Sequence, residues 1–333
     1  MKRTVAEVAV LAVAAGMAMA RMAKAAPGPA GTIGCSGAWA LYPMAVRWGE
    51  EFQKLHANVR FDVSAGGAGK GMTDVLAGVV DIGLVSREVN TAEVARGAFA
   101  IAVTKDAVVP VVSAANPVLD ALRQRGVRRE VLAAIWTRKD VGTWGGVAGN
   151  DATASVRVFT RSDACGAAET WAKYLGGKKQ EDLQGIGVYG DPGLAEAVRR
   201  DPLAIGYNNV NFAYDAKTGQ PLAGLAILPL DVNGNGRLDE EEAVYATQKD
   251  LVAAIVRGAY PSPPARDLYF VTRGKPVRPL VLAFIRWVLT DGQKFVAESG
   301  YIGIPAEQLE KGLKALSAAP AGLTEQVRRS YAP

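Results

Sequence analysis

Apolar residues recur along this chain at two different spacings. The segment ALYPMAVRWGEEFQKLH carries them at helical intervals, from Met44 through Trp48 to Leu55. RFDVSAG alternates with the two-residue period of a strand, and VVDIGLVS is a continuous apolar run typical of a buried strand. Glycine-containing loops follow these strands. Repeated strand–loop–helix units predict an α/β fold, with helices on the faces of a mostly parallel sheet.

The same two patterns continue through the rest of the chain. VRREVLAAIWTRKD and AAETWAKYLGG predict helices, and RPLVLAFIRWVLTDGQKFVAESG predicts a long final helix or a pair of helices. IAVTKDAVVPVVSAANP predicts two short strands, with breaks at Lys105-Asp106 and at Pro110. The 333 residues are enough for two domains, and the proline-rich residues 260–267 are the best candidate for a crossing between them.

The N-terminus has a pattern of its own. Lys2 and Arg3 form a basic start, a short apolar run follows, and residues 23–25 have the small-x-small pattern of a signal peptidase site. The apolar run is shorter than the roughly 20 residues needed to span a bilayer. We therefore predict that residues 1–25 are a cleaved signal peptide and that the mature protein is periplasmic.

Removal of this signal peptide lowers the net charge of the protein. The whole chain carries a formal charge of +5, and the signal peptide holds four basic residues and one acidic residue. The mature chain is therefore near +2, which argues against a nucleic-acid-binding protein. The chain has one histidine and no GxSxG, HExxH or P-loop motif, so we do not expect an enzyme.

The two cysteines leave alternatives open. An exported chain meets oxidising conditions, so Cys35 and Cys165 could form a disulfide if their α-carbons come within roughly 7 Å. Cys165 also precedes a predicted helix, where the pKa of a thiol can be lowered. An exported enzyme or redox protein that uses these two cysteines is therefore the alternative of another class.

Four predicted strand-to-helix loops are suited to an anion. They are CSGAWALYP, AGGAGKGM, LVSREVN and TRSDACGAAET. A helix start leaves main-chain N–H groups unpaired at the positive end of the helix dipole, and small residues let an anion approach them. Arg161, at the end of a strand, offers a planar fork to phosphate or carboxylate, and Asp163 is close enough to hold it. Arg87 in the third loop is a second candidate.

The order and spacing of these segments resemble the periplasmic phosphate-binding proteins of ABC transporters. The resemblance rests on ALYPMAVRWGEEFQKLH, DVSAGGAGKG, GVVDIGLVSRE, IAVTKDAVV and FTRSDACGAAETWAKYL, and on the C-terminal YPSPPARDLYFVTRGKPVRPL and GYIGIP. It implies a two-lobed type II periplasmic-binding-protein fold, each lobe a mixed, mostly parallel sheet flanked by helices, with the ligand cleft between the lobes. We assign residues 26–105 and 260–333 to lobe I and residues 106–259 to lobe II.

This resemblance also implies a function and a set of site residues. The function is that of a monomeric solute-binding protein that captures phosphate for the membrane permease of an ABC importer. Arg161 fits the family's arginine, and Asp163 fits the aspartate that braces it. The implied ligand-binding set is Ala38, Trp39, Ala40, Ala68, Gly69, Ser86, Arg87, Arg161, Asp163, Cys165, Gly166 and Ala167.

Several positions in this set depart from the family. Cys165-Gly166-Ala167 stands where Ser-Gly-Thr is usual, and Ala68 stands where a serine is usual. Ser86 or Arg87 falls where many members have an acidic acceptor. Because several hydroxyls are missing, a different small anion is the alternative: an organic phosphate, a carboxylate or a molybdate-type oxyanion. Trp39 falls where a threonine is common, and it either stacks on an organic group or packs in the core.

Residues 231–242, DVNGNGRLDEEE, have the spacing of an EF-hand calcium loop. The positions that would supply oxygen ligands are Asp231, Asn233, Asn235, Arg237, Asp239 and Glu242. Gly236 stands where the loop must turn sharply, and Arg237 would contribute its main-chain carbonyl. GLAILPL ahead of the loop predicts a strand and not a helix. We therefore predict a structural calcium loop in lobe II, with an empty surface turn as the alternative.

Overall fold

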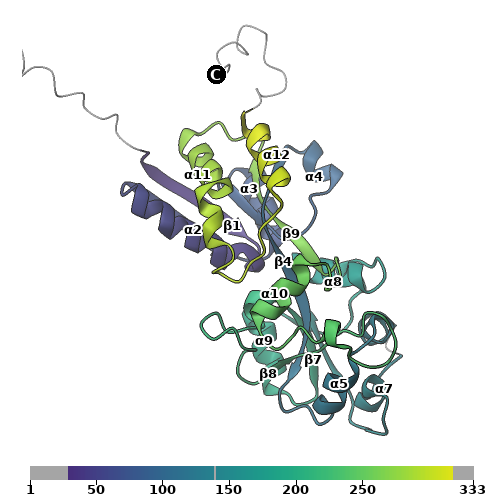
Figure 1. Cartoon of the computed structure of the whole chain (residues 1–333). Coiled ribbons are helices and arrows are strands. Elements are labelled where there is room, and N and C mark those ends of the chain that lie inside the picture. The colour runs from purple at the N-terminus through teal and green to yellow at the C-terminus, as the bar shows by residue number, and fades with distance from the viewer. Residues whose placement is uncertain (1–28, 139, 318–333) are drawn as a thin grey trace, which may run out of the picture.

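Two strands connect the two halves of the molecule in the computed structural model, which describes residues 29–138 and 140–317 (Figure 1). β4 (Ala98–Ser113) and β9 (Ala265–Arg273) are antiparallel neighbours. The predicted breaks in β4 at Lys105-Asp106 and Pro110 were wrong. The first half of this strand pairs with β9 and the second half with β7 (Ala204–Asn209), so hydrogen bonds support it along its length.

Lobe I is built on three further strands, β1 (Gly31–Gly37), β2 (Val59–Ala65) and β3 (Ile82–Val85). β1 lies between β2 and β3 and is parallel to both, and β3 pairs with β9. Its helices are α2 (Tyr42–Leu55), α3 (Ala68–Ala77), α4 (Thr91–Ala95), α11 (Pro279–Leu289) and α12 (Ala306–Ser317). The core is rich in aromatic rings, because Trp48 and Phe52, one turn apart on α2, contact Phe270 and Phe284.

Lobe II is built on the second half of β4, with β5 (Arg157–Arg161), β6 (Ile186–Val188), β7 and β8 (Leu225–Ile227). β5 is parallel to β6 and β7, and β8 pairs with β4. Its helices are α5 (Leu119–Arg125), α6 (Arg129–Ala133), α7 (Trp144–Ala148), α8 (Gly166–Tyr174), α9 (Gly190–Arg200) and α10 (Gln248–Val256). Trp136, Trp171 and Tyr207 pack together in the core with ring centroids 5.5–5.9 Å apart.

The parallel pairs lie within the lobes, and each antiparallel pair involves β4 or β9. Parallel strands carry their carboxyl ends to one edge of a sheet, where an α/β protein binds its ligand. In both lobes that edge lies at the junction between the lobes. In the described part of the chain, no helix combines the length and apolar character needed to cross a membrane. The predicted signal peptide, residues 1–25, lies outside the described residues.

Candidate anion-binding site between the lobes

The loops predicted to hold an anion meet at the junction of the lobes. The Gly69 N–H of lobe I donates a hydrogen bond to the Ala164 carbonyl of lobe II at 3.1 Å. Gly166 lies so near Ser86 that a β-carbon on it would be 2.3 Å from the Ser86 carbonyl and hydroxyl oxygens. The second, third and fourth loops are thus in contact in a closed arrangement of the lobes.

Main-chain N–H groups from both lobes are available at this junction. A 3₁₀ helix (Trp39–Leu41), α3 and α8 begin here. The N–H groups of Trp39, Ala68, Gly166 and Ala167 have no hydrogen-bond acceptor among the residues that the structure describes. The N–H of Ala38 differs, because it donates to the Leu84 carbonyl at 2.8 Å. The unpaired groups are the donors that an anion accepts at helix starts.

Arg161 is fully buried between two carboxylates. Its Nε and Nη2 donate to the two oxygens of Asp163 at 2.8 and 2.6 Å, and Nη1 donates to Asp191 at 2.6 Å. Burial opposes the charge of Arg161, but Asp191 and Asp163 outweigh this effect and hold its pKa above the ordinary value. The predicted bracing of Arg161 by Asp163 is confirmed, and Asp191 is a second partner that was not predicted.

This pairing leaves Arg161 with donors for a guest. A guanidinium has five N–H groups, and the two carboxylates take three of them. One N–H on each terminal nitrogen has no acceptor among the described side chains. N–H groups of a guanidinium are strong donors to phosphate or carboxylate oxygens.

Trp39 spans the junction from lobe I. Its ring packs edge-on against Tyr189 and Phe212 of lobe II, with centroids 6.3 Å away in both cases. Its indole nitrogen is buried and has no hydrogen-bond partner among the described residues. Trp39 is thus a half-buried wall between the lobes and not part of the core of either lobe, whereas its neighbour Ala40 is buried within lobe I.

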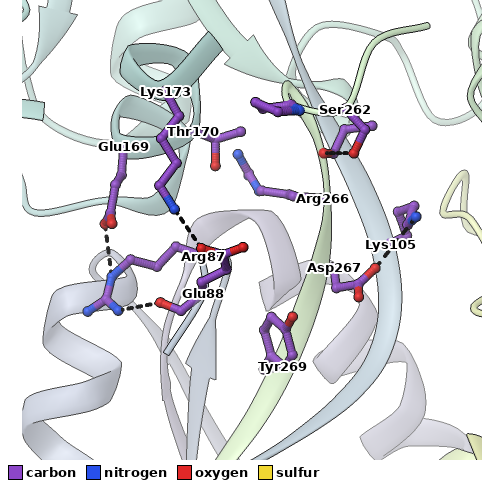
Figure 2. Close-up of a pocket in the computed structure, with 12 residues that line it drawn as sticks. Arg87, Glu88, Lys105, Glu169, Thr170, Lys173, Ser262, Arg266, Asp267 and Tyr269 are labelled. Atoms are coloured by element: carbon purple, nitrogen blue, oxygen red, sulfur yellow. Dashed lines mark hydrogen bonds and ion pairs between the residues drawn. The ribbon is translucent and has the colours of Figure 1, made fainter. Parts of the chain in front are cut away.

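Arg87 is not brought together with Arg161. Its guanidinium donates to both oxygens of Glu93 at 2.6 and 2.9 Å. It also lies 3.1 Å from Glu169 (Figure 2). Arg87 therefore belongs to an ion-pair network at the rim of the junction. Ser86 does face the site, but the structure places no carboxylate at that position.

Four polar residues that were not predicted as site residues are linked in series to Arg161: Asp191, Asn209, Arg266 and Asp106. Both oxygens of Asp191 accept hydrogen bonds, Oδ2 from Arg161 and Oδ1 from the side chain of Asn209 at 2.6 Å. Arg266 donates to the Asn209 side chain and lies 3.8 Å from Asp106. Burial raises the pKa of Asp106 to about 7, although Arg266 opposes this shift. Of the four, only Asp191 stands where a strand passes into a helix, in the first turn of α9 after β6, so the rule that selected the strand-to-helix loops could have found it.

The two cysteines are buried in the cores of different lobes, and neither forms a disulfide. The structure therefore contradicts the two open alternatives, a disulfide and a redox pair between these cysteines. Burial raises the pKa of Cys165 to about 12, which also contradicts the alternative of a lowered pKa. Its sulfur instead accepts a hydrogen bond from the Ala168 N–H at 3.3 Å and caps α8.

The 231–242 loop follows β8 and folds around its own carboxylates. The two oxygens of Asp231 accept the N–H groups of Gly234 and Gly236, and Gly236 has a φ of +82°. Glu242 accepts the Asn233 N–H at 3.0 Å. Among the described residues, no three or more Asp, Glu, Cys or His side chains lie close enough together to hold a metal ion by themselves. A cation here would therefore also need amide and carbonyl oxygens, which are ordinary Ca²⁺ ligands.

Comparison with known proteins gives consistent matches. Residues 23–292 match the family model described as PBP superfamily domain. Phosphate-binding protein PstS of Pseudomonas aeruginosa strain PAO1 is 27% identical over 316 residues, which cover 86% of this chain and 87% of the relative. PstS of Methanocaldococcus jannaschii is 24% identical, with 81% and 82% covered.

Solved structures match across most of the chain as well. A substrate-binding protein from Clostridium perfringens with bound phosphate has a TM-score of 0.67 at 20% identity, and the match covers 83% of this chain and 100% of that one. An ABC-type phosphate transport receptor from Vibrio cholerae has a TM-score of 0.58 at 18% identity, with 82% and 100% covered.

Proposed function

The chain belongs to the PBP superfamily, and we propose that it is a solute-binding protein that captures phosphate, or a closely similar oxyanion, for an ABC importer. The predicted family and the two-lobed type II fold are confirmed by these comparisons. Relatives named phosphate-binding proteins support phosphate as the guest and binding, not catalysis, as the activity. We expect a monomer that delivers its anion to a membrane permease.

One observation carries the proposal most directly. Arg161 is buried, keeps two N–H donors, and lies at a junction where helix starts of both lobes have unpaired N–H groups. A buried anion needs several such donors to replace its lost hydration. Donors from two lobes that separate and close would bind the anion and enclose it in one step.

A panel of anions tests the proposal. We expect isothermal titration calorimetry to give one saturable site for phosphate, with weaker binding of sulfate, molybdate and small carboxylates. Stronger binding of a carboxylate or molybdate would favour the alternative guests, and the absence of anion binding would contradict the proposal.

Replacement of the arginine tests the site itself. We expect Arg161→Ala to cost about 2–5 kcal/mol of binding, because the anion would lose its buried positive partner and would face the uncompensated charges of Asp163 and Asp191. This corresponds to an anion Kd at least about 30-fold weaker. Arg157→Ala is the matched control, since Arg157 lies on the same strand, is half exposed and pairs with Asp201. Equal anion affinity in Arg161→Ala and wild type would show that Arg161 does not bind the anion.

We further propose that the protein is exported and that the 231–242 loop binds one structural Ca²⁺. The signal-peptide pattern of residues 1–25 supports export to the periplasm. Mass spectrometry of the mature protein checks this, with an N-terminus beginning at residue 26 as the expected result. The complete ligand spacing and the left-handed turn at Gly236 support calcium. Extracellular calcium modules bind at roughly 10⁻⁴–10⁻³ M, which is sufficient outside the cytosol.

A further inference from the structure

Arg266 is a buried arginine at the crossing between the lobes. It lies on β9 opposite Asp106 of β4. Its side chain is only 7% exposed and extends from β9 toward α8 (Figure 2). Burial of a guanidinium costs free energy unless charges and hydrogen bonds compensate it. The acceptors that Arg266 contacts therefore indicate its role.

Neutralisation of Asp106 is the simplest role for Arg266, and the contacts point elsewhere. The Nη2 atom of Arg266 is 3.8 Å from Asp106 Oδ2, which is beyond hydrogen-bond distance. Neither oxygen of Asp106 has a hydrogen-bond partner among the described residues. Arg266 instead donates from Nη2 to the Asn209 side chain and from Nη1 to the Gly166 carbonyl at 3.3 Å. Both of these acceptors lead to the anion site.

The first acceptor, Asn209, connects Arg266 to Arg161. Its Oδ1 accepts from Arg266, and its side-chain amide donates to Asp191 Oδ1 at 2.6 Å. The amide can face only this way, because a guanidinium only donates and a carboxylate only accepts. The other oxygen of Asp191 accepts from Arg161 at 2.6 Å. Each of these buried side chains therefore fixes the orientation of the next.

The second acceptor connects Arg266 to a main-chain donor. The Gly166 carbonyl and the Ala167 N–H belong to one planar peptide group, and this N–H has no acceptor among the described residues. A hydrogen bond to the carbonyl fixes the plane of the peptide and polarises its N–H. Arg266 thus orients and strengthens one of the donors that the proposed anion would accept.

We propose that Arg266 is a positioning residue for the anion site and does not itself contact the anion. It acts by two routes: through the side chains of Asn209 and Asp191 to Arg161, and through the Gly166 carbonyl to a main-chain donor. The inference rests on the proposed function and adds to it a residue outside the set of anion contacts. Because Arg266 lies on one of the two strands that connect the lobes, its contacts also join this crossing to the lobe II half of the site.

Arg266→Lys separates the geometry of Arg266 from its charge. Lysine keeps a positive charge beside Asp106, but a single ammonium group cannot replace a planar fork that reaches two acceptors. We expect the variant to fold and to bind inorganic phosphate about tenfold more weakly in calorimetry, the usual size of one lost charge-assisted hydrogen bond. Arg273→Lys is the matched control, because it makes the same replacement at the exposed end of the same strand.

Asn209→Ala tests the route to Arg161. Alone, it is expected to weaken phosphate binding about tenfold as well. If Arg266 acts through Asn209, the double variant with Arg266→Lys should lose clearly less than the roughly hundredfold that two independent effects would give. Losses that multiply would overturn the inference, because the two residues would then act separately.

A background without the Asp106 charge tests the simpler role. In Asp106→Asn there is no carboxylate for Arg266 to neutralise at this position. Arg266→Gln in this background should still weaken phosphate binding about tenfold, because the contacts with Asn209 and the Gly166 carbonyl are lost. Equal phosphate affinity with and without Arg266→Gln in this background would overturn the inference.

NMR spectra of the anion-free protein test the route through the Gly166 carbonyl. Arg266→Lys should shift the amide resonance of Ala167, whose peptide group loses a hydrogen bond. Arg273→Lys should leave this resonance in place. An unchanged Ala167 resonance in Arg266→Lys would overturn this route.

The affinities also separate this inference from the proposed function. Wild-type phosphate affinity in Arg266→Lys or in Asn209→Ala would overturn the inference and leave the proposed function intact. The measurement on Asn209→Ala requires no change at Arg266, so it decides the matter even where Arg266→Lys does not fold. A wild type that binds no anion would overturn the inference and the proposed function together.

Discussion

At the scale of single residues, Gly166 controls how closely the lobes approach. It is the first residue of α8, and its α-carbon faces Ser86 of lobe I. A β-carbon there would lie 2.3 Å from two Ser86 oxygens, a distance that β-carbons do not reach. Because the contact is between lobes and not within one, a side chain at this position would obstruct closure and leave each core intact.

We therefore predict that Gly166→Ala folds normally but binds its anion less tightly. Overpacking typically costs about 1–3 kcal/mol, which corresponds here to a loss of roughly 5- to 150-fold in affinity. Calorimetry gives the affinity and thermal unfolding gives the stability. Gly142→Ala is the control, because a β-carbon there meets nothing within 4 Å. Unchanged affinity in Gly166→Ala would show that closure does not require this contact.

The sequence predicted those site residues that depend on local order. Arg161 and Asp163 are two positions apart in one loop, so their pairing follows from short-range geometry. Asp191 and Asn209 lie on separate elements, and the contacts of Asp191 with Arg161 and with Asn209 depend on how the parallel strands are ordered. Such long-range contacts leave no periodic pattern along the chain.

At the scale of elements, the strand-to-helix loops were predictable because parallel strands place their carboxyl ends together. β4 was not, because the polar pair Lys105-Asp106 looks like the end of a strand. In the fold, Asp106 lies opposite Arg266 on β9. This oppositely charged partner, which comes from a distant segment, allows Asp106 to lie inside the strand. Hydrophobic pattern alone cannot reveal a partner 160 residues away.

The calcium loop gives a prediction for a single element. Removal of calcium with a chelator is expected to lower the unfolding temperature, because an ion bound only to the folded state stabilises it. The effect is roughly 1–3 kcal/mol at calcium concentrations ten to a hundred times the Kd. Glu242→Gln should abolish the response to calcium, since Glu242 supplies the last ligand of the loop.

Glu241→Gln is the matched control for this loop. Glu241 is exposed and lies between ligand positions, so its replacement should leave the calcium response unchanged. Differential scanning calorimetry with and without calcium checks both variants. An identical midpoint for the wild type in calcium and in chelator would favour the alternative of an empty surface turn.

At the scale of the whole molecule, two ion pairs of opposite sense join the lobes at the rim of the site. Arg87 of lobe I lies 3.1 Å from Glu169 on α8, and Lys173 on α8 donates to Glu88 of lobe I at 2.8 Å (Figure 2). Glu169 and Lys173 are one helical turn apart, so a single face of α8 meets both partners. We call these four residues the rim clasp.

The rim clasp should contribute modestly to closure. Glu88 is 80% exposed and Lys173 is 40% exposed, and exposed pairs are worth about 0.2–1 kcal/mol. Its two pairs form only when the lobes are together, so their energy favours the closed, anion-bound state. The two-lobed arrangement was predictable from the family resemblance. The pairing of Arg87 and Glu88 with α8 was not, because it depends on where α8 and the loop after β3 lie in space.

A charge swap tests the rim clasp. Glu88→Lys places two lysines opposite each other and should weaken anion binding by about 1 kcal/mol, roughly fivefold in Kd at low salt. Addition of Lys173→Glu restores an attractive pair with the two charges exchanged, and it should recover most of the lost affinity. Both effects should shrink at 1 M salt, where the screening length falls to about 3 Å. Lys249→Glu, at an exposed position of α10, is the control for a change of net charge. If the double variant binds no better than Glu88→Lys, the attraction between residues 88 and 173 does not contribute to closure, which then depends on the buried contacts between the lobes.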